Sequence, residues 1–175
     1  MKPTTDVSHR RPQVAILGSS EADATMTRLA EQAGAAVARA GAALVTGGRG
    51  GVMAAAAKGC HEAGGIVIAV TPGTGMDEVN DHTHYVIPTG LGWARNVITA
   101  IAGDVILAVG GAAGTLSELA FAWMYDRPII ALSGAGGWAR ELAGRTMDHR
   151  RDDCVIDCRD IAELDGLLRG LLGKR

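Results

Sequence analysis

Lysine is rare in this sequence. Only three lysines occur among the 175 residues, Lys2, Lys58 and Lys174, and two of them lie close to the ends of the chain. A pyridoxal phosphate enzyme needs a lysine that forms a Schiff base with the cofactor. Lys58 falls inside a predicted helix, away from its N-terminus, so pyridoxal-dependent chemistry is excluded.

Aromatic residues and basic clusters are also scarce. The chain has three Trp, two Tyr and one Phe, a formal net charge of −2 and a pI near 6.2. Surfaces that bind nucleic acid combine basic grooves with aromatic platforms, so we expect no nucleic acid partner. There is no run of about 18 apolar residues, so no membrane span is predicted.

Two common nucleotide-binding motifs are missing. The first glycine turn reads Gly-Ser-Ser-Glu over 18–21, which is not Gly-x-Gly-x-x-Gly. The second, Gly-Gly-Arg-Gly-Gly over 47–51, is not followed by Lys-Ser or Lys-Thr. These departures disfavour an ordinary NAD dehydrogenase and a Walker-type ATPase.

Cysteine is too sparse for a disulfide framework. The odd count of three predicts buried, reduced thiols in a cytoplasmic protein. His82 and His84 lie in an acidic loop and are expected to be solvated. The prediction is therefore that the protein has no metal site.

The apolar content of 47% indicates a globular chain of one domain. Residues 1–12 are polar and contain two prolines, which predicts a flexible N-terminal tail. Residues 13–175 are then a single Rossmann-like nucleotide-binding domain.

Short apolar stretches alternate with helical patterns along this domain. Strands are predicted over 13–18, 43–46, 66–70, 85–87, 105–109, 128–132 and 155–156. Helices are predicted to follow most of them, the first beginning at Ser19-Ser20 as capping residues. This alternation predicts an α/β fold, Rossmann-like and doubly wound, with a mostly parallel sheet and helices on both faces.

Glycine clusters follow one predicted strand after another. They fall at the carboxyl edge of the sheet, where open α/β sheets bind ligands. Glycine allows positive φ and close approach of backbone N–H groups to a phosphate. The residues predicted to contact phosphate in these turns are Gly18, Ser19, Gly47, Gly48, Arg49, Gly50, Gly51, Gly110, Gly111, Gly114 and Thr115. The alternative is that the glycines only end helices and tighten turns.

The segment 103–121 combines a strand, a glycine turn and a helix. An apolar run over 105–109 is interrupted by three glycines, and helical spacing follows. Such a turn brings unpaired N–H groups to a helix N-terminus, where the helix dipole favours an anion. Gly114 is expected to need a positive φ. Glu118 lies one turn into the helix, so a carboxylate is predicted beside a phosphate cradle.

Arg95 and Asn96 belong to the predicted helix that precedes this strand. Arg95 can bind a ligand phosphate through two N–H groups, or it can orient Glu118. Asn96 is a further candidate for ligand binding. The alternative is a structural ion pair of Arg95 with Glu118 or Asp104. Arg95 and Glu118 are the candidate catalytic residues.

These motifs resemble the Lonely Guy (LOG) superfamily, whose members are often labelled lysine decarboxylase-like. The family signature Pro-Gly-Gly-x-Gly-Thr-x-x-Glu is matched by Gly-Gly-Ala-Ala-Gly-Thr-Leu-Ser-Glu over 110–118. Its upstream arginine is matched by Arg95, nine residues before Asp104. Gly110 stands at the signature proline and Ala112 at its second glycine.

The resemblance covers about residues 13–172. The segments 46–53, 89–96 and 136–138 look closer to the branch that contains molybdenum cofactor carrier proteins. It implies a small-molecule ligand that is a nucleotide or a pterin phosphate. It also implies a homodimer or higher homo-oligomer, built through the largely apolar helix predicted over 116–126.

Two functions are compatible with this resemblance. The first is hydrolysis of the N-glycosidic bond of a nucleoside 5′-monophosphate, with Arg95 holding the ribose phosphate and Glu118 activating water. This activity needs no cofactor. The second is a non-catalytic carrier of molybdenum cofactor, in which the same cradle holds the pterin phosphate. A nucleotide sensor is a third, weaker alternative.

Overall fold

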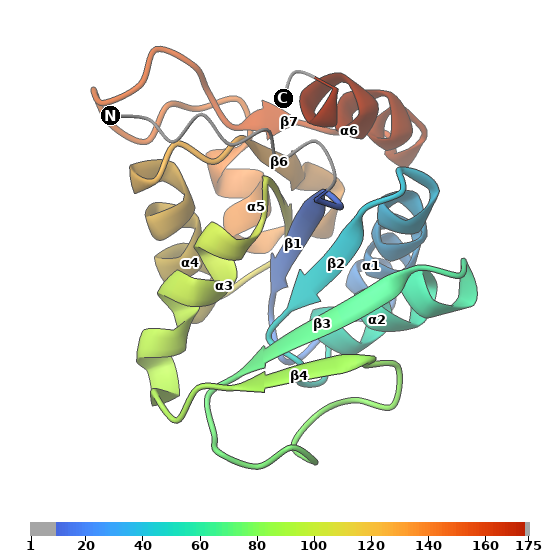
Figure 1. The fold of residues 1–175 in the computed structure, drawn as a ribbon. Helices are drawn as coiled ribbons and strands as arrows, with labels where there is room; N and C mark the ends of the chain where they lie inside the picture. Colours follow the sequence, from blue (N-terminus) through green and yellow to red (C-terminus); the bar gives the residue numbers. More distant parts are fainter. Residues whose placement is uncertain (1–9, 174–175) are drawn as a thin grey trace.

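The computed structural model describes residues 10–173 and is built on a seven-stranded sheet (Figure 1). The strand order is β4-β3-β2-β1-β5-β6-β7, and all six neighbouring pairs are parallel. The strands are β1 (Gln13–Gly18), β2 (Ala43–Thr46), β3 (Ile66–Thr71), β4 (Tyr85–Pro88), β5 (Val105–Val109), β6 (Ile129–Leu132) and β7 (Ile156–Asp157). The predicted Rossmann-like, doubly wound α/β fold is confirmed.

Helices cover both faces of the sheet (Figure 1). One face carries α1 (Ala24–Arg39), α2 (Val52–Glu62) and α6 (Leu164–Leu172), and the other carries α3 (Asn96–Ala102), α4 (Ala113–Met124) and α5 (Gly137–Leu142). Short 3-10 turns precede three of these helices: η1 (Gly92–Arg95), η2 (Ser133–Ala135) and η3 (Ile161–Glu163).

The central strand β1 shows why both faces are needed. Val14 and Ile16 join the cluster under α1, α2 and α6, whereas Ala15 and Leu17 join the cluster under α3, α4 and α5. Successive side chains of a strand point to opposite faces, so a continuous apolar run requires cover on both sides.

Two glycines bring α1 and α2 into close contact. A Cβ atom on Gly34 would collide with the carbonyl of Ala56, and one on Gly59 would collide with the carbonyl of Glu31. Side chains larger than hydrogen are therefore excluded at both positions, and the two helices pack backbone against backbone.

The direction of strand addition reverses at the β1–β5 seam. From β1 the chain adds β2, β3 and β4 toward one edge, and then crosses back to place β5 on the other side of β1. The loops after β1 and β5 leave in opposite directions, although Gly18 and Val109 are register partners. Open α/β sheets form a crevice for ligands at such a point.

Helix α1 begins later than predicted. Its N-cap is Asp23, whose side chain accepts a 2.8 Å hydrogen bond from the N–H of Met26, so the predicted capping role of Ser19 and Ser20 is wrong. The extended backbone of Asp23 suits an N-cap residue. Residues 19–22 consequently form a loop at the carboxyl edge of the sheet.

The described start of the chain is tied to the sheet. Arg10 forms a 2.8 Å ion pair with Asp104, and the carbonyl of Pro12 accepts a hydrogen bond from the N–H of Ala43. Residues 1–9 of the predicted flexible tail lie outside the described residues. Within residues 10–173, no helix has both the length and the apolar character to span a bilayer.

All three cysteines are free thiols. Cys60 and Cys158 are buried, and burial raises the pKa of each thiol to about 11. Cys154 is exposed, so the prediction that all three are buried is wrong for this residue. It lies in the irregular segment before β7, where no helix covers it.

Candidate functional site

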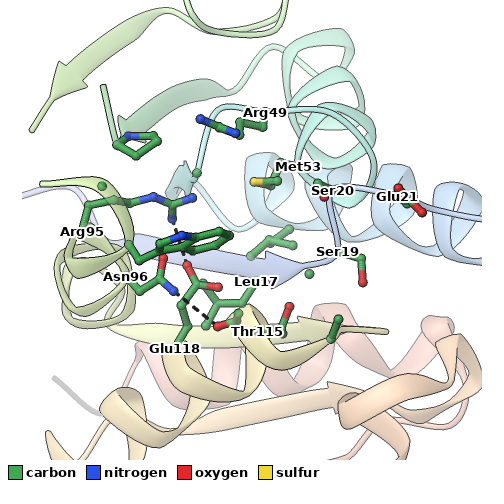
Figure 2. Close-up of a pocket in the computed structure, with 18 residues that line it drawn as sticks. Leu17, Ser19, Ser20, Glu21, Arg49, Met53, Arg95, Asn96, Thr115 and Glu118 are labelled. Carbon is green, nitrogen blue, oxygen red and sulfur yellow. Dashed lines mark hydrogen bonds and ion pairs between the residues drawn. The ribbon is translucent and has the colours of Figure 1, made fainter. Parts of the chain in front are cut away.

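A cavity of about 730 Å³ lies at the carboxyl edge of the sheet, over the β1–β5 seam. The loops after β1 and β2, the η1 turn and the first turn of α4 contribute its walls. Figure 2 shows Arg95 and Asn96 reaching in from one side, Thr115 and Glu118 from α4, and Arg49 from the loop after β2. Pockets of this size hold small molecules and cofactors.

The structure places nine of the predicted site residues on the cavity wall: Gly18, Ser19, Gly47, Arg49, Arg95, Asn96, Gly114, Thr115 and Glu118. The other five, Gly48, Gly50, Gly51, Gly110 and Gly111, do not line it. These five glycines belong to the loops after β2 and β5. A ligand-binding role remains a prediction for the first group.

Gly110 and Gly111 serve packing between loops. Both have positive φ, and their carbonyls accept hydrogen bonds from the backbone N–H groups of Ala139 and Trp138 in α5. A Cβ atom on Gly137 would lie 2.6 Å from the carbonyl oxygen of Gly111. The missing side chain of Gly137 therefore lets the start of α5 approach the loop after β5, whereas Cβ atoms on Gly110 and Gly111 would press on Met26 and Thr115.

Gly114 has an ordinary negative φ, so the expectation of a positive φ there is wrong. It belongs to the first turn of α4, where helical φ is required. A Cβ atom built on it would meet Cζ3 of Trp93 at 3.6 Å, an ordinary contact distance. Neither the backbone conformation nor the immediate contacts of residue 114 therefore require glycine.

The N-terminus of α4 opens onto the cavity without a capping side chain. Its N-cap residue is Ala112, and the first turn contains no acidic residue. The first helical hydrogen bond runs from the N–H of Leu116 to the carbonyl of Ala112. The N–H groups of the three residues before Leu116 therefore have no acceptor within the helix, and the helix dipole favours an anion beside them.

Arg95 and Glu118 form a buried ion pair on the cavity wall. Nη1 of Arg95 lies 3.0 Å from Oε1 of Glu118 and also donates to the hydroxyl of Thr99 at 3.0 Å. Each of the two residues is only 7% exposed. The predicted alternative of a pair with Asp104 is wrong, because Asp104 pairs with Arg10.

Burial controls the protonation of this pair. Loss of solvation raises the pKa of Glu118 to about 7, against the opposing effect of the Arg95 charge. The same loss of solvation lowers the pKa of Arg95, and the nearby positive charge of Arg49 acts in the same direction. A carboxyl whose pKa lies near neutrality can exchange protons at physiological pH.

A glycine makes room for the guanidinium of Arg95. A Cβ atom on Gly47 would lie 2.5 Å from Nη2 of Arg95. The next part of this loop is held by Asn80, which donates to the carbonyl of Gly48 at 3.1 Å and to that of Arg49 at 3.3 Å. The loop between β3 and β4 thus fixes the backbone that carries Arg49.

Asn96 connects α3 to the first turn of α4. Its Nδ2 donates to the hydroxyl of Ser117 at 2.9 Å, and that hydroxyl donates to the carbonyl of Gly114 at 2.7 Å. Asn96 is buried. Its hydrogen bonds hold the η1–α3 wall of the cavity against α4.

Several wall residues were missed by reasoning from the sequence. Ser20 and Glu21 lie on the loop freed by the late start of α1, and Met53 lies in the first turn of α2. Trp93 stands in the η1 turn. The scarcity of aromatic residues could have drawn attention to Trp93, whereas Glu21 and Met53 carry no comparable signal.

No group of three His, Cys, Asp or Glu side chains within residues 10–173 is arranged to hold a metal ion. The ring centroid of His61 lies 5.6 Å from that of His82 and 5.1 Å from that of His84. Nδ1 of His84 accepts a hydrogen bond from the N–H of Val67, which fixes the loop to β3.

Comparison with known proteins identifies the family of this chain. Residues 11–164 match the model of the SLOG cluster4 family. The chain belongs to this family. As a SLOG cluster4 protein it has the LOG-like fold that the signature over 110–118 predicted, and that resemblance is confirmed.

Similar solved structures include two proteins that handle molybdenum cofactor. The molybdenum cofactor binding protein of Rippkaea orientalis superposes with a TM-score of 0.82 at 32% identity, over 93% of this chain and 98% of that one. The molybdenum cofactor carrier protein of Chlamydomonas reinhardtii gives a TM-score of 0.80 at 32% identity, over 94% and 99%.

A curated relative has an enzymatic name. The cytokinin riboside 5′-monophosphate phosphoribohydrolase of Mycobacterium tuberculosis is 33% identical over 130 residues, which span 67% of this chain and 68% of that protein. The proteins similar to this SLOG cluster4 protein thus include a cofactor-binding protein, a cofactor carrier and a phosphoribohydrolase.

Proposed function

We propose that this protein binds a nucleoside 5′-monophosphate in the cavity and hydrolyses its N-glycosidic bond. The observation that carries the proposal is the buried Arg95–Glu118 pair, which stands one helical turn from the uncapped N-terminus of α4. An ion pair with a purely structural role would be equally effective away from a cavity. Arg95 and Glu118 instead both line a cavity that is large enough for a nucleotide.

The phosphate would lie at the first turn of α4. The free N–H groups there and the hydroxyl of Thr115 line this part of the cavity, and the guanidinium of Arg49 lines another part of the wall, on the loop after β2 (Figure 2). Arg95 is largely neutralised by Glu118, so Arg49 is the main uncompensated positive charge on the wall.

The ribosyl carbon C1′ would lie over Glu118. Water would form the new C–O bond as the C–N bond breaks, with the electron pair of that bond leaving on the base nitrogen, which takes up a proton. Ionised Glu118 would accept the proton of the attacking water and stabilise the positive charge that develops on the sugar. Arg95 would hold the ionised carboxylate in position.

Release of adenine from AMP tests this proposal directly. The purified protein is incubated with a panel of nucleoside 5′-monophosphates, and free base is separated by chromatography. Base release that requires the 5′-phosphate supports the hydrolase, because adenosine lacks the group that the α4 N-terminus would bind. Absence of base release from every monophosphate contradicts it.

Thermal unfolding tests the phosphate anchor separately. A ligand that binds only the folded state raises the melting temperature. Millimolar AMP or pyrophosphate should produce this shift, and adenosine should produce much less. Equal shifts from AMP and adenosine would remove the argument for a phosphate anchor.

Carriage of molybdenum cofactor is the second candidate function. It is supported by the similarity to the Rippkaea and Chlamydomonas proteins, which extends over nearly their whole length. The same donors at α4 would hold the pterin phosphate as cargo. Native mass spectrometry of protein purified from a host that makes the cofactor would detect a bound pterin.

A homodimer remains part of the proposal. Met124 and Tyr125 at the end of α4 are exposed in the single chain, and Leu116, Ala120 and Phe121 of the same helix are only partly buried. A second copy would cover them. Light scattering of the purified protein gives the oligomeric state, and a monomer would contradict this expectation. We also propose a cytoplasmic location, in keeping with the free thiols.

A further inference from the structure

The three tryptophans of the chain differ sharply in their surroundings. Trp123 is 2% exposed, and its indole N–H donates to Asp148 at 2.9 Å. Trp138 lies in α5 and packs, partly buried, against the core. Trp93 is 83% exposed, the highest value among the large hydrophobic side chains exposed within residues 10–173. Folding alone does not account for a tryptophan in this position, because burial of its ring would stabilise the protein.

Trp93 is held at the cavity by a fixed backbone. The N–H of Gly92 donates to the carbonyl of Pro72 at 3.0 Å, and the N–H of Ala94 donates to the carbonyl of Leu91 at 3.1 Å. Two residues further on, Arg95 is locked into its buried ion pair. The indole ring of Trp93 is therefore exposed, whereas the backbone that carries it is held by hydrogen bonds.

The indole stands beside the phosphate-binding end of α4. Its Cζ3 atom would lie 3.6 Å from a Cβ atom on Gly114, in the first helical turn. Apolar side chains contribute other parts of the same wall: Leu17, Met53 and Pro72. The cavity thus combines an anion site with an aromatic face and aliphatic surroundings, which is the environment a planar ring requires.

We propose that Trp93 stacks on the heterocyclic ring of the ligand while α4 holds the ligand's phosphate. Trp93 is then a positioning residue that selects phosphates bearing a planar heteroaromatic ring over plain sugar phosphates. The inference rests on the phosphate-bearing ligand of the proposed function, but it does not depend on hydrolysis.

Intrinsic fluorescence provides the first test. AMP, neopterin monophosphate and ribose 5-phosphate are titrated into the wild type and into Trp93→Phe, which keeps Trp123 and Trp138 as internal reference signals. At least one of the two ringed phosphates should quench the wild type, and this quenching should be lost in Trp93→Phe. Ribose 5-phosphate should leave the emission unchanged. Failure of both ringed phosphates to quench Trp93 overturns the proposal.

Calorimetric affinities provide the second test. Trp93→Ala should bind the ringed phosphate about 5- to 150-fold more weakly, which corresponds to the loss of about 1–3 kcal/mol of base stacking on an aromatic side chain. Trp93→Phe should remain within about threefold of the wild type, and ribose 5-phosphate should bind all variants alike. Tyr85→Ala, which removes an exposed aromatic ring outside both the cavity wall and the proposed dimer contact, is the matched control.

The outcomes separate this inference from the hydrolase. Ring binding that depends on Trp93 without base release supports the stacking role and contradicts hydrolysis. Base release by Trp93→Ala with an unchanged KM for AMP contradicts the stacking role and leaves hydrolysis intact. Equal weakening of AMP and ribose 5-phosphate in Trp93→Ala shows a purely structural effect and overturns the proposal.

Discussion

Helices α1 and α4 start at the same edge of the sheet, but only α1 has a side chain that caps its N-terminus. In α1, the carboxylate of Asp23 accepts a hydrogen bond from the N–H of Met26. In α4, the residue at the equivalent position is Ala112, which has no group to offer. The chain closes the first helix end with its own side chain and leaves the second open toward the cavity. Under the proposed function, the uncapped N-terminus of α4 is a binding element and the capped N-terminus of α1 belongs to the scaffold.

The largest effect is expected from the carboxylate that the open helix carries. Glu118→Gln keeps the shape of the side chain and removes its charge. Turnover of AMP should fall by at least ~10²-fold, because a general base contributes about 10²–10⁴-fold, whereas AMP affinity should stay within about threefold. Steady-state kinetics and calorimetry measure the two effects. Equal turnover in the two proteins would refute the mechanism but leave the binding site intact.

The raised pKa of Glu118 adds a pH dependence. The ionised form is the active base, so kcat should rise through about pH 7, where this carboxyl loses its proton. Stability should change in the opposite direction. Because the folded protein retains the proton more strongly than the unfolded chain, the free energy of unfolding should fall as pH rises from about 4.5 to about 7. Glu118→Gln should flatten this part of the stability curve, as followed by urea unfolding.

The next largest effect should come from closing α4 in the way α1 is closed. Ala112→Asp places an acceptor at a residue whose extended backbone, φ −112° and ψ −161°, suits an N-cap. A cap contributes about 1 kcal/mol, so the variant should be more stable than the wild type. The new charge would repel the ligand phosphate, and AMP affinity should fall by about tenfold or more. A more stable variant with unchanged AMP affinity would place the phosphate elsewhere.

The reverse change in α1 should be smaller and confined to stability. Asp23→Ala removes the cap and should lower the free energy of unfolding by about 1 kcal/mol. AMP affinity should not change, because Asp23 does not line the cavity. Chemical denaturation gives the first quantity and calorimetry the second. Asp23→Asn, which retains an acceptor, is the control and should recover most of the lost stability.

The smallest effect is expected at Gly114. Its φ is ordinary and a methyl group would meet only the edge of Trp93, so Gly114→Ala should change stability by less than about 1 kcal/mol and AMP affinity by less than about threefold. Gly51→Ala is the matched contrast. Gly51 has a φ of 61°, and a Cβ atom there would press on the backbone of Ser20, so this variant should be clearly destabilised.

The sequence was sufficient for the sheet and most of its helices. Apolar runs such as 105–109, bounded by glycines, mark buried parallel strands with little ambiguity. The start of α1 was not predictable in the same way, because Ser19, Ser20 and Asp23 are all good caps. Tertiary structure decides among them. The carbonyl of Ser19 accepts a hydrogen bond from the N–H of Val52 at the start of α2, and Asp23 caps α1 instead.

The site was predicted in outline but not in detail. Arg95 and Glu118 were identified from their types and spacing, and they meet in space. The glycines could not be sorted, since a turn that approaches a ligand and a turn that approaches a neighbouring helix need the same residue. Gly110, for example, makes room for Met26 of α1, and only the packing of α1 reveals this. The exposure of Trp93 likewise depends on the path of the η1 turn.

The central position of β1 also bears on how the chain folds during synthesis. Gly18 ends a strand whose two neighbours are made at very different times: β2 follows within about 30 residues, but Val105 is 87 residues further along the chain. At a translation rate of about 5–20 residues per second, β5 lags behind β1 by roughly 4–20 seconds. During that interval one side of β1 is an unpaired strand edge, the kind of surface that recruits other chains. The packed pair α1 and α2 covers only one face of the nascent sheet, so one edge and one face of β1 stay open until β5 has been made.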